Sequence, residues 1–181
     1  MKKFIALVVL LCTVMISFPA SAEIKIVPLC EQDVPTLTQK LQEIPGVKIW
    51  GIKKFSGCYI GYFGNDDKNR LDFLLENDDS IKALFIESKF GNEDPIFEQM
   101  WKLAGGTLVI AGVTLEDVAN LIQDIGSDMQ KALSKDSRLK EYKKSFSVYR
   151  AQNNEKIVVN FSAKELTSNF GEFKIIIFAH E

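Results

Sequence analysis

The chain has few side chains whose types and spacing could carry out catalysis. Its single histidine, His180, is the penultimate residue of the sequence. A Ser-His-Asp or Cys-His site needs an imidazole that a third group holds in fixed geometry, and the last residues of a chain are usually poorly ordered. We therefore expect His180 to be a surface residue, and we predict no catalytic residue.

The sequence also lacks the ligand patterns of metal and cofactor sites. One histidine and widely separated cysteines match no zinc ligand set. The segment 65–69 lacks the alternating oxygen ligands, the central glycine and the closing glutamate of a calcium loop. Gly105, Gly106 and Gly112 fit no phosphate-binding motif. We expect neither a metal nor a cofactor.

Acidic doublets are the remaining candidates, because paired carboxylates can hydrolyse glycosides. The doublets are Asp66-Asp67, Asp78-Asp79 and Glu93-Asp94. Each falls at an expected helix end or turn, where a carboxylate caps a helix or stays solvated. We favour this structural role, and a hydrolase that uses carboxylates alone is kept as an alternative.

The N-terminus has the three-part pattern of a secretory signal peptide. Lys2 and Lys3 precede an apolar run from Phe4 to Phe18, and small residues follow it up to Ala22. The run is shorter than the roughly 20 apolar residues that a membrane span needs. We expect cleavage near Ala22, a location in the periplasm or otherwise outside the cell, and no stable membrane insertion afterwards.

The charge of the chain limits its partners. Loss of the two lysines of the signal peptide would change the formal net charge from −2 to −4. Acidic and basic residues are interspersed along the rest of the sequence, unlike the basic patch of a protein that binds nucleic acid or an anionic membrane surface. We therefore expect a protein partner and no nucleic acid.

After cleavage the chain would keep an even number of cysteines, Cys30 and Cys58. An oxidising compartment favours a disulfide between them, which would contribute about 3 to 4 kcal/mol on the chain-entropy model. A pair of buried thiols is the alternative. Their wide separation does not match the Cys-X-X-Cys motif of redox-active dithiols.

The region after the expected cleavage site predicts a helix and a hairpin. Apolar residues recur at helical spacing over 34–44, behind Asp33 as a capping residue. The segments 47–55 and 58–63 are rich in β-branched and aromatic residues and are joined by a Ser-Gly turn, which predicts a β-hairpin. Its aromatic residues are expected to pack across the strands, and they also form a possible interaction surface. They include Trp50, Tyr59 and Tyr62.

The rest of the chain alternates between helical and strand patterns, and the charged segment 134–144 continues the last helix in broken form. The predicted helices cover 65–76, 95–103 and 115–133, and the predicted strands cover 83–87, 107–111, 145–149, 157–161 and 173–178. The strand, helix and strand over 83–112 would place two strands parallel in one sheet.

This order of elements predicts the fold class. A βαβα unit followed by antiparallel strands is the chain order of a thioredoxin-like core. We therefore predict a single α/β domain over 23–181, with α+β character at its C-terminus and a mixed sheet flanked by helices. Within it, 81–181 would form the thioredoxin-like core, and 23–80 would add a helix and a β-hairpin at the N-terminus.

Part of this core resembles a known family. The segment 83–90, the helix after Pro95 and the segment 104–113, with its Gly-Gly-Thr-Leu-Val-Ile run, resemble the TrbC family of conjugative pilus-assembly proteins. Those are periplasmic proteins of type IV secretion systems with a thioredoxin-like core. The resemblance implies a role in assembly through protein contacts. Its possible contact residues here are Ser88, Lys89 and Phe90.

Three hypotheses of function follow from these observations. The leading one is a non-catalytic periplasmic protein that assists assembly of a conjugative pilus or type IV secretion apparatus. The alternative is a periplasmic immunity or inhibitor protein that binds a toxin or hydrolase. Aromatic side chains exposed on the hairpin would favour this alternative. The second alternative is the carboxylate-dependent hydrolase.

Overall fold

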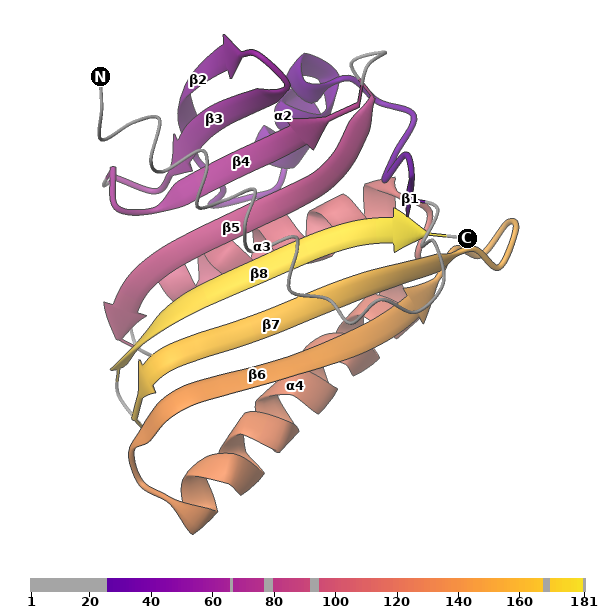
Figure 1. Cartoon of the computed structure of the whole chain (residues 1–181). Helices are drawn as coiled ribbons and strands as arrows, with labels where there is room; N and C mark the ends of the chain where they lie inside the picture. Colours follow the sequence, from indigo (N-terminus) through magenta and orange to yellow (C-terminus); the bar gives the residue numbers. More distant parts are fainter. Residues whose placement is uncertain (1–25, 66, 77–79, 92–94, 168–169, 181) are drawn as a thin grey trace.

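The structure is a computed structural model that describes residues 26–65, 67–76, 80–91, 95–167 and 170–180. Over these residues the chain forms an antiparallel sheet with helices along it (Figure 1). The expected signal peptide lies outside the described residues. So do Asp66, Asp78-Asp79 and Glu93-Asp94.

The sheet connects most of the described chain. Its main path has the order β2-β3-β4-β5-β8-β7-β6, and the short β1 pairs with β8. Within the described part, all pairings between named strands are antiparallel. The strands are β1 (Ile26–Val27), β2 (Ile49–Phe55), β3 (Cys58–Phe63), β4 (Arg70–Leu75), β5 (Ile81–Gly91), β6 (Leu139–Tyr149), β7 (Lys156–Leu166) and β8 (Phe170–His180).

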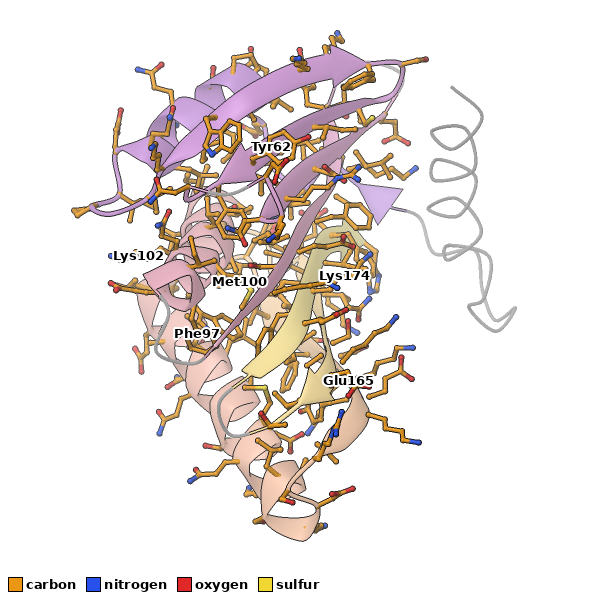
Figure 2. The ribbon with its side chains drawn as sticks, turned by 90° about the vertical axis from the view of Figure 1, so that its left-hand side faces the viewer. Tyr62, Phe97, Met100, Lys102, Glu165 and Lys174 are labelled. Carbon is orange, nitrogen blue, oxygen red and sulfur yellow. The ribbon has the colours of Figure 1, made fainter. Side chains whose placement is uncertain are left out.

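Helices cover one face of this sheet. They are α2 (Val34–Gln42), α3 (Pro95–Ile110) and α4 (Leu115–Lys135), and all of them lie behind the sheet in Figure 1. Figure 2 shows the same layers from the side, with Phe97 and Met100 of α3 on one side of the sheet and Lys174 of β8 on the other. The hydrophobic core fills the space between the helices and the sheet.

Buried and partly buried side chains alternate along the central strands, so one face of these strands meets the core and the other does not. Over 156–163 of β7 and 171–180 of β8 every second residue is buried beneath the helices, and the residues between them are only partly buried. The buried set is Ile157, Val159, Phe161, Ala163, Phe173, Ile175, Ile177 and Ala179. This period of two is typical of antiparallel strands with one face against a core.

Two predicted helix starts are confirmed. The Asp33 carboxylate accepts a hydrogen bond from the backbone N–H of Thr36 at 2.8 Å, which caps α2. Thr114 caps α4 in the same way, with its hydroxyl oxygen 3.1 Å from the backbone nitrogen of Asp117. Each cap satisfies a backbone donor that has no partner within the helix.

The strand predicted over 107–111 is wrong. Residues 107–110 continue α3, which ends at Ile110, so Gly105 and Gly106 lie inside a helix and do not stop it. Gly106 is needed for close packing, because a Cβ atom there would meet side chains of Ile44 and Leu41. A short apolar run fits a buried helix as well as a buried strand, and here the helix forms.

The helix predicted over 65–76 is also wrong, because residues 70–75 form β4. Leu71, Phe73 and Leu75 are buried in alternation with their neighbours, which is the period of a strand. The predicted helical continuation over 134–144 is wrong in its second half, where β6 begins at Leu139.

The predicted α/β class is confirmed, but the predicted parallel strand pair and the thioredoxin-like core are not. The parallel pair expected over 83–112 does not form, because its second strand is helical. The thioredoxin-like core is not confirmed. The sheet continues without a break from β2 to β6, across the expected boundary between the N-terminal addition and the core.

Candidate functional site: the uncovered face of the sheet

The side chains that point away from the helices form the second face of the sheet, which we call the open face. Because directly paired residues of an antiparallel sheet lie on the same face, the strand register shows which of these side chains are neighbours. One row of paired residues crosses the whole sheet, and we call it the central row. It consists of Trp50, Tyr62, Arg70, Glu87, Lys174, Ser162 and Lys143.

The β2 end of the central row is aromatic. The rings of Trp50 and Tyr62 lie 5.0 Å apart between centroids, and Trp50 is 38% exposed. The Trp50 indole N–H donates to the carbonyl of Gly64 at 3.1 Å, which fixes the orientation of the ring. A register shift follows Trp50 at Gly51, whose φ of +66° suits glycine. The pair is therefore a rigid, partly exposed aromatic surface.

The middle of the central row is charged. Arg70 pairs with Asp72, with a guanidinium nitrogen 2.8 Å from a carboxylate oxygen. Glu87 pairs with Lys174, whose ammonium nitrogen lies 2.5 Å from a carboxylate oxygen and 5.5 Å from the centroid of the Phe85 ring. These charges of both signs lie on three neighbouring strands.

Water is already partly excluded from the Arg70–Asp72 pair of this charged cluster, whereas Glu87 is more exposed. The Asp72 side chain is only 13% exposed. Burial raises the pKa of Asp72, the nearby charge of Glu87 acts in the same direction, and the hydrogen bond from Arg70 opposes the rise. Partly desolvated charges bind a complementary surface at a smaller further cost than fully hydrated ones. The arrangement suits recognition of another molecule that carries both charges.

An apolar row runs parallel to the central row on the open face. Its members are paired across six strands and are Phe55, Cys58, Leu74, Ala83, Phe178 and Val158. Phe55 is 38% exposed, and Leu74, Phe178 and Val158 are half-buried. Contiguous apolar surface beside charged groups is typical of protein interaction sites.

The structure unites only part of the predicted interaction surface. Trp50 and Tyr62 lie together on the open face. Tyr59 belongs to the opposite face, where it packs against the core with the Lys54 ammonium 5.7 Å from its ring. The predicted grouping of Tyr59 with Trp50 and Tyr62 is therefore wrong, because alternate residues of β3 point to opposite faces.

The predicted contact residues at the end of β5 are also separated from one another. Ser88 is buried on the helix face, where its hydroxyl donates to the side-chain oxygen of Asn69. Its side chain is therefore not accessible to a partner. Lys89 is exposed on the open face and pairs with Glu172 at 2.5 Å. The side chain of Phe90 lies outside the described part of the structure.

Sequence reasoning missed the charged cluster. The sequence pattern predicts a helix for Arg70 and Asp72, and no local pattern marks Glu87 or Lys174 as their neighbours. The alternation of buried and polar residues over 70–75 was a usable signal for a strand. The pairing of β5 with β8 was not predictable, since more than 80 residues separate Glu87 from Lys174.

The disulfide predicted between Cys30 and Cys58 is absent, and both residues are free thiols. Cys30 bridges to Ile81, and Cys58 pairs with Leu74, so β4 and β5 lie between the two cysteines. At a strand spacing of about 4.8 Å, this places them about 14 Å apart. A disulfide needs Cα atoms within about 7 Å.

The described residues hold no group of three or more His, Cys, Asp or Glu side chains that could bind a metal ion. His180 lies in β8, paired with Ile26 and Lys156. Asp67, a member of the first acidic doublet, is exposed. None of the described helices is long and apolar enough to cross a membrane.

These observations define the class of the protein: an α/β protein with helices on one face of an antiparallel sheet and a mixed aromatic, charged and apolar surface on the other. Comparisons with protein families, with characterised proteins and with solved structures found no match to this chain.

Proposed function

We propose that the mature chain is a non-catalytic periplasmic protein that binds another protein through the open face of its sheet. The central row carries this proposal, because it places a rigid aromatic pair beside charges of both signs. Aromatic side chains and arginine dominate the energy of protein interfaces. The open face contains both kinds of side chain, namely the aromatic Trp50 and the arginine Arg70.

The setting that we propose is assembly of a conjugative pilus or type IV secretion apparatus. The resemblance of segments 83–90 and 104–113 to the TrbC family and the expected signal peptide support it. A correspondence with a thioredoxin-like core belongs to this proposal and would depend on the order of elements from β5 to β8.

An immunity or inhibitor protein is the second candidate, and a specific observation favours it. Trp50 and Phe55 are each 38% exposed on the β2–β3 hairpin, as expected of a surface that covers another protein. Both lie on the open face, so both candidate functions use the same surface and differ in the partner.

The carboxylate-dependent hydrolase has less support. Asp72 and Glu87 are the carboxylates that gather at the centre of the open face, and each has a cationic partner within 2.8 Å. Each carboxylate is therefore engaged in an ion pair within the sheet, whereas a glycosidase needs two carboxyl groups directed at its substrate.

An affinity pull-down from a periplasmic extract of the native source tests the proposal. The bait is the purified mature chain, compared with Trp50→Ala and with a control, Leu115→Ala, which removes an apolar side chain that is 74% exposed on α4. We expect Trp50→Ala to weaken binding of the captured protein at least about tenfold, as for the loss of an interface hot spot. The control should bind as the wild type does.

The identity of the captured protein separates the two settings. Secretion or pilus components would support the assembly role, and a toxin or hydrolase would support the inhibitor role. Binding that Trp50→Ala leaves unchanged, with both variants folded by circular dichroism, would contradict the use of the open face.

A further inference from the structure

A second surface, distinct from the open face, lies along the outer edge of β6. In the described part of the chain, β6 pairs with β7 on one side and with no strand on the other. The unpaired part of this edge ends just after Tyr149, where Val113 forms a β-bridge to Arg150. Backbone groups along an unpaired edge are a template for another strand.

A pocket of about 220 Å³ lies between this edge and α4. From β6 it is lined by the four consecutive residues Phe146 to Tyr149, and from α4 by Asp117, Asn120, Leu121 and Asp124. Consecutive strand residues point to opposite faces, so a pocket that touches all four must reach the edge of the strand. It is smaller than the about 300 to 1,000 Å³ of typical small-molecule pockets, which suits a single side chain.

The chemistry of the pocket favours a cation. Asp117 and Asp124 provide carboxylates, Asn120 provides an amide oxygen, and Phe146, which lies on the helix face of β6, provides an aromatic ring. Tyr149 points to the open face and is 47% exposed, so it borders the pocket at the strand edge. The Phe146 ring already has a cation near it, because the Lys144 ammonium lies 5.4 Å from its centroid. Carboxylates and aromatic faces together recognise lysine and arginine side chains.

The basic residues of β6 form their ion pairs with carboxylates outside this pocket, although the Lys144 ammonium also lies near the Phe146 ring. Lys143 pairs with Glu141 at 2.7 Å, and Lys144 pairs with Asp128 at 2.8 Å, both nearer the start of β6. Asp117 and Asp124 lie toward the Tyr149 end of the groove, where the neighbouring Arg150 is paired with Glu155 at 3.0 Å. If an extended segment pairs along β6, a side chain on the helix-facing side of that segment would enter the pocket.

We propose that the β6 edge binds an extended segment of another protein by strand addition, with a lysine or arginine of that segment in the pocket between Asp117 and Asp124. A second copy of this chain fits less well, because α4 lies along the β6 edge (Figure 1). Joined β6 edges are about 4.8 Å apart, whereas packed helices need about 8 to 10 Å.

Fluorescence anisotropy with a designed peptide tests this inference. The probe is a fluorescein-labelled heptapeptide, Thr-Thr-Val-Arg-Val-Thr-Thr, with an otherwise identical peptide that has Glu in place of Arg. We expect saturable binding of the arginine peptide and no binding of the glutamate peptide. Asp124 is exposed, so Asp124→Asn should weaken binding up to about fivefold, the loss expected for an exposed charge pair. Asp117 is left unchanged because it also bonds the Thr114 cap.

Glu116→Gln is the matched control, since it removes an exposed carboxylate of α4 that does not line the pocket. It should bind the peptide as the wild type does. Hydrogen exchange should slow in 140–148 when the arginine peptide is bound, as strand addition requires. The inference is overturned if the wild type does not bind the peptide, if Asp124→Asn binds it equally, or if β6 gains no protection. It is also overturned if sedimentation equilibrium shows a dimer that Asp124→Lys dissociates.

Discussion

At the scale of single residues, Asp128 shows how side chains attach α4 to the edge of the sheet. The Tyr142 hydroxyl donates to the Asp128 carboxylate at 2.7 Å, and the Lys144 ammonium lies 2.8 Å from the same oxygen. The hydrogen bond from Lys144, followed by that from Tyr142, lowers the pKa of Asp128. One carboxylate therefore links two residues of β6 to the helix.

This arrangement predicts a pH dependence of stability. A carboxyl group whose pKa is lower in the folded state stabilises the protein above its unfolded pKa of about 3.9, and this contribution is lost as the pH falls through the folded value. Asp128→Asn should therefore destabilise the protein at about pH 6 and have a much smaller effect at about pH 2.5. Urea unfolding of both proteins at both pH values measures the difference. An equal effect at the two pH values would show that the charge of Asp128 does not contribute to the stability of the protein.

The cysteines give a second prediction at this scale. Cys30 is buried at 4% exposure, and Cys58 is half-buried on the open face. A thiol reagent should modify Cys58 of the native mature protein and should reach Cys30 only after denaturation. Mass spectrometry of protein purified without reductant from an oxidising compartment measures this. A mass two hydrogens lower, with neither thiol reactive, would show that the disulfide forms and would contradict the fold around β4 and β5.

At the scale of elements, the glycines of the helices have opposite roles. A Cβ on Gly106 of α3 would meet Ile44 and approach Leu41 to 3.0 Å, whereas one on Gly126 of α4 would meet no atom within 4 Å. Gly106→Ala should lower the free energy of unfolding by about 1 kcal/mol, because the cost of overpacking exceeds the gain in helix propensity. Gly126→Ala should raise it by up to about 1 kcal/mol.

Denaturant unfolding of the two variants beside the wild type measures both changes. Stabilisation by Gly106→Ala would show that α2 does not pack closely on α3. Destabilisation by Gly126→Ala would contradict the exposure of the middle of α4.

The elements also show what could be predicted from the sequence. The hairpin at 49–63, the capped helices α2 and α4 and the C-terminal strands were predicted because capping residues and period-two patterns are local signals. The end of α3 was not, because Gly105-Gly106 is a stop signal locally and a packing requirement in the fold. Tertiary contact decided the outcome there, and no local pattern contains that information.

The candidate site depended even more on long-range pairing. Trp50 and Tyr62 were predicted together because one hairpin joins them. The charged residues beside them come from β4, β5 and β8, and the insertion of β8 next to β5 brings Lys174 to Glu87. Such pairings between distant segments follow from the order of strands in the sheet, which the sequence pattern alone does not determine.

At the scale of the whole molecule, the two faces of the sheet have different roles. The helix face contains the core, so it stabilises the fold. The open face combines aromatic, charged and apolar rows, and the β6 edge adds a groove with an acidic end. Two such surfaces on one small domain would allow it to contact two segments of a partner, or two partners, at once.

Site-specific photo-crosslinking in the native periplasm tests the open face most directly. A photoreactive phenylalanine analogue replaces Ser162, which lies in the central row, or Gln123, which is exposed on α4. If the open face binds a protein, irradiation should give a discrete adduct from position 162 and none from position 123, and Trp50→Ala should abolish it. Adducts from position 123 alone, or from neither position in cells that produce the partner apparatus, would contradict the proposal.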